Sequence, residues 1–592
     1  MAGDCRQAVL DCRYTHTLLR RKRKLKKAFC LLLVLVMVLN MFTACKGEEL
    51  SATDGKTEGI SPLTDKNAIP DLTGYTITIL TTDTWVSGLT ISDVLPKFRQ
   101  IEERTGCTII WETAPSGGDF STVLQTRLTG DPSECPDVIL LPTNTTTLAK
   151  YIDEGLLYDI TKAYDYCPNI KAFYEESRTD LKGSFTYCDG GIYNLLSNVN
   201  ISPDDQRKSI AETGDNAIWY RADIAAELGW TTYPKTMSEL YQLLSQVHQA
   251  YPDMVPMHMY DWSGWESAKI FNSAYGLHFN NEECGTFFYP DENGTVQFEP
   301  ALEATKEWLA EMNKWYREGL IVVGNSEEQK IGAAAKGVTF SGFYAGVTEM
   351  CETALKKLEP DAYFMYMPFP KASQNDPTLM PRCDFYNSFA IVDNGDEEQC
   401  LATAQFLDYA FLSYYGMCSE VLGVEGEGWS LDENGKFCPN MDYVGKLLTG
   451  EEIREFSGAN IHFNGPTTFN YEIGAAYRNA RIQAREELGY EDPMSAEQKA
   501  NWQEINEINV SYYQPAYPMF YMEEEDQDEY SRLYADIETY TQEMLERYIL
   551  GTADLNNFEN EFVATLYNRL QLQKVLDIQQ KYYDTYLENA AE

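Results

Sequence analysis

Three apolar, strand-like runs decide the fold: 75-YTITIL-80, 108-TIIWE-112 and 137-DVILL-141. The first run alternates apolar and polar β-favouring residues, as a half-buried strand does. Both intervals between the runs carry apolar residues at helical spacing. A strand–helix–strand–helix–strand series predicts a parallel α/β sheet. The helical apolar residues are Val94, Leu95, Phe98 and Ile101 in the first interval, and Phe120, Val123, Leu124 and Leu128 in the second.

The carboxyl ends of these runs predict where a ligand binds. In a parallel α/β sheet, ligands bind beyond the carboxyl ends of the strands. Asp83, Thr84 and Trp85 follow the first run, and residues 142–144 (Pro-Thr-Asn) follow the third. We therefore expect these residues at a cleft.

The segment 20-RRKRKLKKAFCLLLVLVMVLNMFTAC-45 has the order of a secretory signal peptide: basic, apolar, then small residues. Its apolar run, Ala28–Leu39, has 12 residues, whereas a membrane-spanning helix needs about 20. Cys45 after Thr-Ala resembles the lipobox of bacterial lipoproteins, although Phe42 stands where Leu is usual. We predict a signal peptide over 1–44, then a lipidated Cys45 with a flexible tether over 45–73. A plain cleaved signal is the alternative.

Charge and cysteine content exclude several classes of function. The net charge is −44, and residues 1–44 hold nine Lys/Arg but two Asp/Glu, so the remainder is more acidic still. Such a charge repels nucleic acid and anionic lipid headgroups. Ten cysteines follow Cys45 without a C-x-x-C pair, and four histidines remain, so we predict no metal site. We expect mostly buried free thiols, with Cys167 and Cys188 as the pair to test for a disulfide.

Further motifs follow one another along the chain: 136-PDVI-139, 157-LYDIT-161, 190-GGIYNL-195, 218-IWYRAD-223 and 233-YPKTMSEL-240, then the segments at 336–344, 363–370, 389–392, 423–429 and 549–566. Their order and spacing closely resemble those of the lipid-anchored extracellular solute-binding proteins of bacterial ABC importers, and within them the large saccharide-type lipoproteins of Gram-positive bacteria. The resemblance covers roughly residues 74–592.

The resemblance implies a two-lobed, periplasmic-binding-protein-like α/β fold with a hinge. The ligand would lie between the lobes and be trapped by hinge closure. A first lobe of 74–196 plus 386–422 and a second lobe of 197–385 plus 423–592, with extra helices, are implied. The implied function is non-enzymatic: a monomer without cofactor, held by lipid on the outer face of the cell membrane, delivers a saccharide to ABC importer permease subunits.

A sugar site needs aromatic platforms beside polar groups, because a neutral sugar presents both flat C–H faces and hydroxyls. The sequence offers such groupings after the first run, around a Ser-Gly turn at 263–264, and in a Gly-rich loop at 423–429. We predict ligand contacts at Asp83, Trp85, Trp262, Trp265, Phe343, Tyr344, Glu425 and Trp429. Ordinary packing is the alternative at each position.

Three other aromatic or acidic residues are not among these predicted contacts. Tyr193 and Asp384 are secondary candidates for ligand contact. Trp219 lies inside the apolar 218-IWY-220 run, so we predict that its side chain belongs to the core.

Other functions stay open at this point. A surface glycoside hydrolase needs only two carboxylates about 5–10 Å apart, and the 91 acidic residues leave room for such a pair. No nucleophile elbow, metal motif or phosphate loop supports an enzyme. A sensor for a membrane receptor would share the fold. A peptide ligand would need cations for its carboxylate, which Arg221 or Arg382 could supply, but aromatics outnumber cations around the predicted cleft.

Two DENG sequences, at 291–294 and 432–435, lie between β-like runs. They predict hairpin turns. A calcium loop would need more oxygen ligands at regular spacing than these segments supply.

Overall fold

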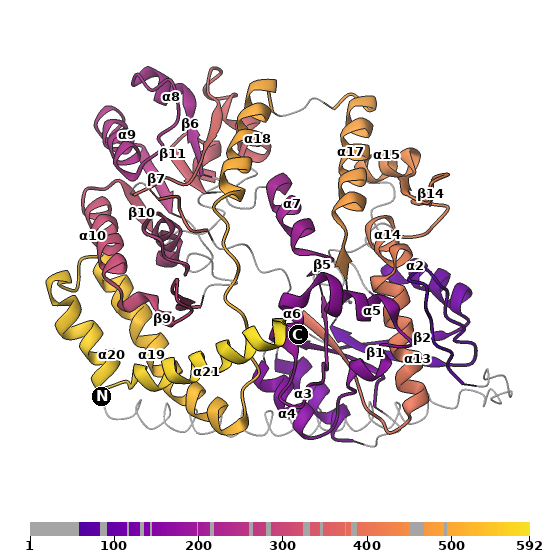
Figure 1. The fold of residues 1–592 in the computed structure, drawn as a ribbon. Coiled ribbons are helices and arrows are strands. Elements are labelled where there is room, and N and C mark those ends of the chain that lie inside the picture. The colour runs from indigo at the N-terminus through magenta and orange to yellow at the C-terminus, as the bar shows by residue number, and fades with distance from the viewer. Residues whose placement is uncertain are drawn as a thin grey trace, which may run out of the picture. The chain divides into compact units, whose positions relative to one another are not determined.

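The chain folds around two five-stranded mixed sheets, which Figure 1 shows with their helices. In this computed structural model, residues 56–592 form one compact unit. Each sheet has its own large buried core, which confirms the predicted α/β class. The structure describes residues 59–82, 91–114, 118–130, 135–142, 145–197, 199–213, 218–259, 264–279, 286–323, 332–343, 347–372, 375–379, 387–449, 467–490 and 494–591.

The first sheet has the order β2-β1-β3-β13-β4 and begins with the three predicted strands. β1, β2 and β3 are parallel, and Ile79 of β1 lies between Trp111 and Val138. β13 runs antiparallel to both β3 and β4. The elements are β1 (Thr76–Thr82), α2 (Ile91–Thr105), β2 (Thr108–Ala114), α3 (Gly118–Leu128), β3 (Val138–Pro142), β4 (Leu195–Ser197) and β13 (Asn387–Ile391).

The second sheet has the order β10-β7-β11-β6-β12. β7, β10 and β11 are parallel, whereas β6 runs antiparallel to β11 and β12. Trp219 of β6 is 1% exposed, which confirms its assignment to the core. The elements are β6 (Ile218–Arg221), α9 (Met237–Ala250), β7 (Val255–Met259), α10 (Glu303–Arg317), β10 (Ile321–Val323), β11 (Thr339–Phe343) and β12 (Phe364–Met367).

Helix α18 (Ala496–Val510) covers the open edge of β12 with amide side chains. Asn501 accepts a hydrogen bond from the Tyr366 N–H at 2.8 Å and donates to the Tyr366 carbonyl at 3.1 Å. Gln498 donates to the Phe364 carbonyl at 2.9 Å. An unpaired strand edge can pair with the strand of another chain. The amide side chains of α18 prevent this, because they form the hydrogen bonds that a neighbouring strand would otherwise make with β12.

Two further groups of helices extend the cores. α14, α15 and α17 enclose a small third core around Trp429, and the C-terminal helices enlarge the core of the second sheet. The bounds are α13 (Glu397–Leu407), α14 (Tyr414–Leu422), α15 (Met441–Thr449), α17 (Tyr471–Glu487), α19 (Glu524–Ile549), α20 (Ala564–Asn568) and α21 (Leu572–Ala591).

Both DENG sequences form hairpin turns, as predicted, with β8 (Phe288–Pro290) paired to β9 (Val296–Phe298) and β14 (Trp429–Leu431) paired to β15 (Phe437–Pro439). In the first turn, Asp291 Oδ1 accepts from the backbone of residues 293 and 295 at 2.9 Å. The second turn repeats this pattern. No group of side chains able to hold a metal occurs in the described part of the chain.

Residues 59–72 belong to the folded body rather than to the tether in which the sequence placed them. Gln405 Nε2 donates to the Ser61 carbonyl at 2.7 Å, and Asn169 Nδ2 donates to the Lys66 carbonyl at 2.9 Å. Leu72 is fully buried. The signal segment and Cys45 lie outside the described residues. Among the described helices, none has the length and apolarity needed to cross a membrane.

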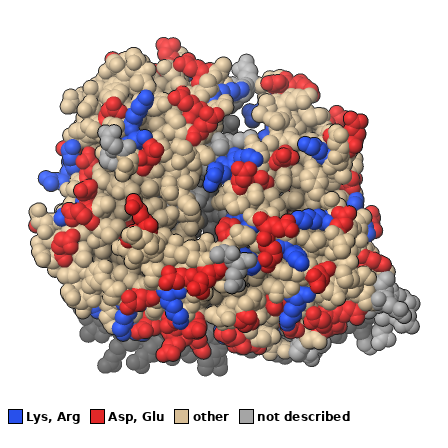
Figure 2. Space-filling view, viewed as in Figure 1, with Lys and Arg blue, Asp and Glu red and all other residues tan. Residues whose placement is uncertain are grey.

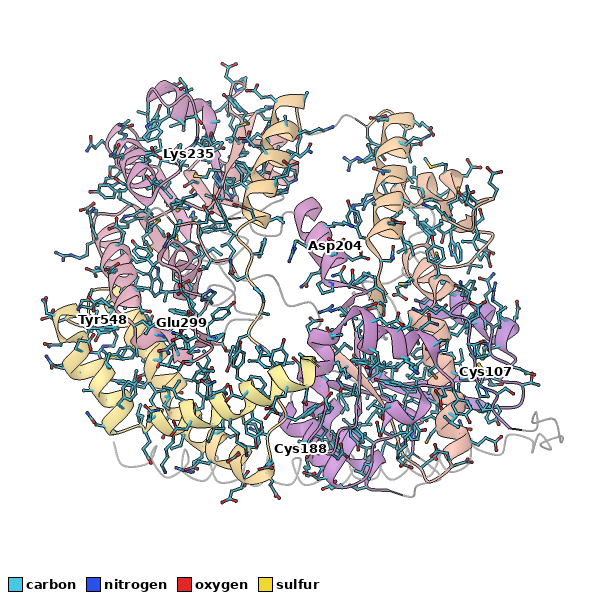
Figure 3. The ribbon with its side chains drawn as sticks, in the orientation of Figure 1. Cys107, Cys188, Asp204, Lys235, Glu299 and Tyr548 are labelled. Carbon is cyan, nitrogen blue, oxygen red and sulfur yellow. The ribbon has the colours of Figure 1, made fainter. Side chains whose placement is uncertain are left out.

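No disulfide joins two of the cysteines that the structure describes. Cys167 is buried and Cys188 is exposed, so the disulfide considered between them is wrong. Figure 3 labels Cys188 and the buried Cys107. The prediction of mostly buried thiols is confirmed within the described part of the chain, where Cys107, Cys167, Cys351, Cys400 and Cys418 are buried.

Candidate functional site

The strand registers bring the carboxyl ends of several strands to one edge of each sheet. In the first sheet this edge holds the ends of β1, β3 and β4 and the start of β13. In the second it holds the ends of β7, β11 and β12 and the start of β6. We call these the ligand edges, since ligands bind beyond the carboxyl ends of strands.

Two connections run between the ligand edges: one from β4 to β6, and one from the end of β12 to the start of β13. β4 ends at Ser197 on the first edge, and β6 begins at Ile218 on the second, where it pairs with Phe343. Between them lie β5 (Val199–Asn200) and helix α7 (Pro203–Thr213). A ligand at either edge therefore lies near the segments that link the sheets.

Four of the eight predicted contacts lie within three positions after these strand ends. Asp83 and Trp85 come after β1, Trp262 after β7, and Tyr344 after β11. These four residues lie outside the described residues, as do Asp384 and Arg382 and the side chain of Trp265. Their ligand contacts remain predictions.

Phe343 is the predicted contact that the structure places at a ligand edge. It ends β11 and is half-buried. Its ring meets Phe271 edge-on at 5.5 Å between centroids and lies parallel to Phe369 at 6.4 Å. Both supporting rings are fully buried. Phe343 therefore presents an aromatic surface on a rigid apolar base, which suits the C–H face of a sugar.

Glu425 binds to α2 and does not lie at a ligand edge. Its ion pair and its backbone hydrogen bonds hold the 423–429 loop against that helix. Its carboxylate accepts from Arg104 at 2.8 Å. Gln100 binds its backbone twice, accepting from the N–H at 2.9 Å and donating to the carbonyl at 3.0 Å. Tyr415 packs under the Arg104 guanidinium at 4.0 Å, and burial raises the pKa of Tyr415 to about 12.

This fastening is at the opposite end of the first sheet from the ligand edge. α2 connects two parallel strands, so it runs back from the ligand edge toward the strand starts. The Leu72 N–H donates to the Thr105 carbonyl at 2.7 Å just before β1 begins. Arg104 and Glu425 therefore lie near the amino ends of the strands, where the geometry gives no support to ligand contact by Glu425.

Trp429 is placed as a core residue. Its side chain is 1% exposed, and its indole N–H donates to the Gly423 carbonyl at 2.9 Å. Tyr415 and Phe437 pack against its ring. Its local sequence is rich in glycine, but α14 and α17 supply the surrounding apolar side chains. Contact between Trp429 and a ligand stays a prediction without geometric support.

Two further candidates are already engaged within the chain. The Tyr193 hydroxyl donates to Asp189 at 2.5 Å, in the turn that precedes the start of β4. Arg221 is 1% exposed, and its guanidinium donates to Asp223 and Glu359 at 2.6 Å. Arg221 is therefore not available to a peptide carboxylate.

The sequence did not predict the residues that hold Phe343 or those that hold the Glu425 loop. Phe271 and Phe369 hold Phe343, and Lys97 of α2 forms a buried ion pair with Glu420 at 2.5 Å. The helical spacing of Lys97, Gln100 and Arg104 was a usable signal, because it puts three polar groups on one face of α2. The partners, however, lie more than 300 positions away.

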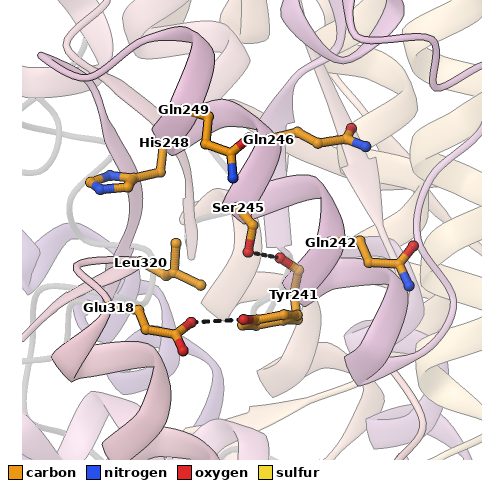
Figure 4. Close-up of a pocket in the computed structure, with 8 residues that line it drawn as sticks. All are labelled: Tyr241, Gln242, Ser245, Gln246, His248, Gln249, Glu318 and Leu320. Carbon is orange, nitrogen blue, oxygen red and sulfur yellow. Dashed lines mark hydrogen bonds between the residues drawn. The ribbon is translucent and has the colours of Figure 1, made fainter.

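A polar groove of about 420 Å³ lies elsewhere on the second sheet (Figure 4). The Tyr241 hydroxyl donates to Glu318 at 2.8 Å across it. Leu320, which lines the groove, directly precedes β10, so the groove is at the amino end of that strand. It contains none of the predicted contacts.

Comparisons with known proteins agree with this geometry. The family model described as bacterial extracellular solute-binding protein matches residues 85–413. A comparison with curated protein sequences gave no significant match.

Several solved structures share the fold. An extracellular solute-binding protein from Bifidobacterium longum subsp. infantis gives a TM-score of 0.62 at 17% identity, over 86% of this chain and 98% of that one. The S. pneumoniae ABC-transporter substrate binding protein FusA, solved with kestose, gives 0.60 at 18% identity, over 87% and 100%. The alginate-binding protein AlgQ2, solved without calcium ion, gives 0.59 at 19% identity, over 86% and 98%. Because the family model covers more than half of the sequence, the chain belongs to the bacterial extracellular solute-binding proteins.

Proposed function

We propose that this solute-binding protein captures an oligosaccharide between two lobes, one on each sheet, and delivers it to the permease of an ABC importer. The family makes it a binding protein rather than an enzyme. The sugar ligand, the importer and a lipid anchor on Cys45 are the proposal.

The aromatic surface of Phe343 carries the choice of a sugar. A half-buried ring at a ligand edge, supported by two buried rings, offers flat apolar contact without a charge. Asp83, Trp85, Trp262, Trp265 and Tyr344 would complete the site with one carboxylate and further aromatic platforms. Related folds support this class, since one neighbour was solved with kestose and another, from Bifidobacterium longum infantis, is an HMO-binding solute-binding protein.

The charge of the protein favours a neutral ligand over a polyanion. Figure 2 shows Asp and Glu side chains spread over the face that it draws, in keeping with the net charge of −44. Such a field repels anionic ligands at long range. An uncharged oligosaccharide meets no such barrier.

The packing suggests a revised division into lobes. Residues 423–449 and 467–487 pack with α2 and α14, beside the core of the first sheet. We assign them to the first lobe, together with 59–197 and 387–422. The second lobe would hold 218–372 and 494–591. Closure of the two lobes around the sugar would exclude water and present one closed shape to the permease.

A thermal-shift panel of purified protein tests the ligand class. A ligand that binds only the folded form adds RT ln(1 + [L]/Kd), which is about 2.7 kcal/mol at 100 times Kd. We expect a rise in Tm with one class of neutral oligosaccharide and none with peptides or polyamines. A rise with peptides and with no sugar would contradict the proposal.

A further inference from the structure

The C-terminal helix α21 packs on the core of the second sheet and also on a helix of the first lobe. Its first half is buried in the core of the second sheet, through Leu572, Val575 and Ile578. Gln580 accepts from the Val296 N–H of the β8–β9 hairpin at 2.7 Å, and Lys581 bridges to Asp526 at 2.7 Å. This half is therefore fixed to the second lobe.

The last turns of α21 pack on α6 (Thr179–Phe185), a helix of the first lobe. The contact centres on Gly183. A Cβ atom added there would lie 3.0 Å from the ring of Tyr586 and 3.0 Å from the Cβ of Ala590. Glycine inside a helix costs about 1 kcal/mol relative to alanine, so its presence fits a need for this close approach.

Tyr521 makes a second attachment at the same helix. It belongs to the core of the first sheet, whereas its neighbours Phe520 and Met522 belong to the core of the second. Its ring meets Phe185, the last residue of α6, at 6.2 Å, and its hydroxyl donates to Asn194 at 3.3 Å. Residues that are adjacent in the sequence therefore pack into different cores.

We propose that α21 and Tyr521 form a strap across the lobes, and that its contact with α6 is the stationary pivot of lobe closure. Contacts near a rotation axis move least, and the close approach of α21 to Gly183 leaves little space for the two helices to slide. Moving Tyr521 out of the core would also expose its buried ring to water. The free energy that this costs is larger than the usual difference between two native conformations of one protein. The strap therefore stays in place while the ligand edges approach.

A reversible cross-link tests the pivot. Gly183→Cys with Ala590→Cys would bring two Cβ atoms to 3.0 Å, about 0.8 Å closer than in an ordinary disulfide, so the helices must part by that small distance in both the reduced and the oxidised form. Cys188→Ser in the background removes the exposed thiol beside α6. We expect the oxidised protein to bind sugar with a Kd within threefold of its reduced form, and to compact on binding in X-ray scattering. A tenfold loss of affinity, or loss of the compaction, would overturn the pivot.

A larger side chain at position 183 should have the opposite effect on sugar binding. Gly183→Leu should force α21 away from α6 and weaken sugar binding at least tenfold, although no predicted ligand contact changes. Gly445→Leu in α15 is the matched control, because a Cβ there meets nothing within 4 Å. Equal affinities of the Gly183→Leu and parent proteins would overturn the proposal.

This inference rests on the proposed function, because it concerns ligand-driven closure. The two fail differently. If no sugar binds the parent protein, the proposed function fails, and the pivot is then tested by hydrogen exchange without ligand. We expect α6 and the last turns of α21 to exchange as slowly as the two cores, and faster exchange at that contact would overturn the pivot.

Discussion

At the residue scale, Phe343 is the side chain on which the sugar assignment depends. Phe343→Ala removes the aromatic surface but leaves its buried supports, Phe271 and Phe369, in place. We expect sugar affinity to fall roughly tenfold to a hundredfold, since stacking on an aromatic ring contributes about 1–3 kcal/mol. Titration calorimetry with the sugar found in the thermal-shift panel measures this. Tyr316→Ala, which removes an exposed ring at the end of α10, is the control and should change nothing.

Asp408 predicts a pH dependence of stability. It is buried and accepts from the Ile170 N–H and the Asn169 amide, both at 2.7 Å, and burial raises its pKa to about 6. A carboxyl whose pKa is higher in the folded state takes up a proton on folding, so its contribution is largest at low pH and is lost as pH rises through 6.

We therefore expect Asp408→Asn to remove part of the pH response. Between pH 7 and pH 4.5, the parent protein should gain about 2 kcal/mol in free energy of unfolding relative to this variant. Urea unfolding at the two pH values measures the difference. Asp165→Asn, at an exposed carboxyl, should follow the parent. The same response in Asp408→Asn and in the parent would show that Asp408 titrates normally.

At the scale of elements, the buried ion pair between α2 and α14 should be the sharpest test of packing. Lys97 and Glu420 have side chains 3% and 4% exposed. Removing one partner leaves a buried charge and costs about 3–5 kcal/mol, whereas replacing both with apolar residues is close to neutral. We expect Lys97→Met to destabilise strongly and Lys97→Met with Glu420→Leu to recover most of the loss in chemical denaturation. Equal stabilities of the two variants would contradict this account.

The elements also show what the sequence could predict. Alternation at 75–80 and helical spacing at 94–101 predicted β1 and α2, because each pattern is set by local geometry. The cover of α18 on β12 could not be predicted, since Asn501 and Tyr366 are 135 positions apart. Trp429 was assigned to a ligand site because its loop is rich in glycine. Its real neighbours come from α14 and α17, which no local pattern reveals.

At the scale of the whole molecule, Cys45 should decide where the protein resides. Lipidation would hold it at the cell surface, close to the permease. We expect Cys45→Ala to move the protein from the membrane fraction to the culture medium with its sugar affinity unchanged. Cys30→Ala, inside the predicted signal peptide, is the control. Equal membrane retention of the Cys45→Ala and parent proteins would contradict the anchor.

The central claim is that two lobes close around an oligosaccharide, and small-angle X-ray scattering with and without the sugar tests it most directly. Hinge closure draws two lobes together, so the radius of gyration should fall at saturating sugar and stay constant with a sugar that gives no thermal shift. A bound sugar that leaves the radius of gyration unchanged would contradict capture by closure.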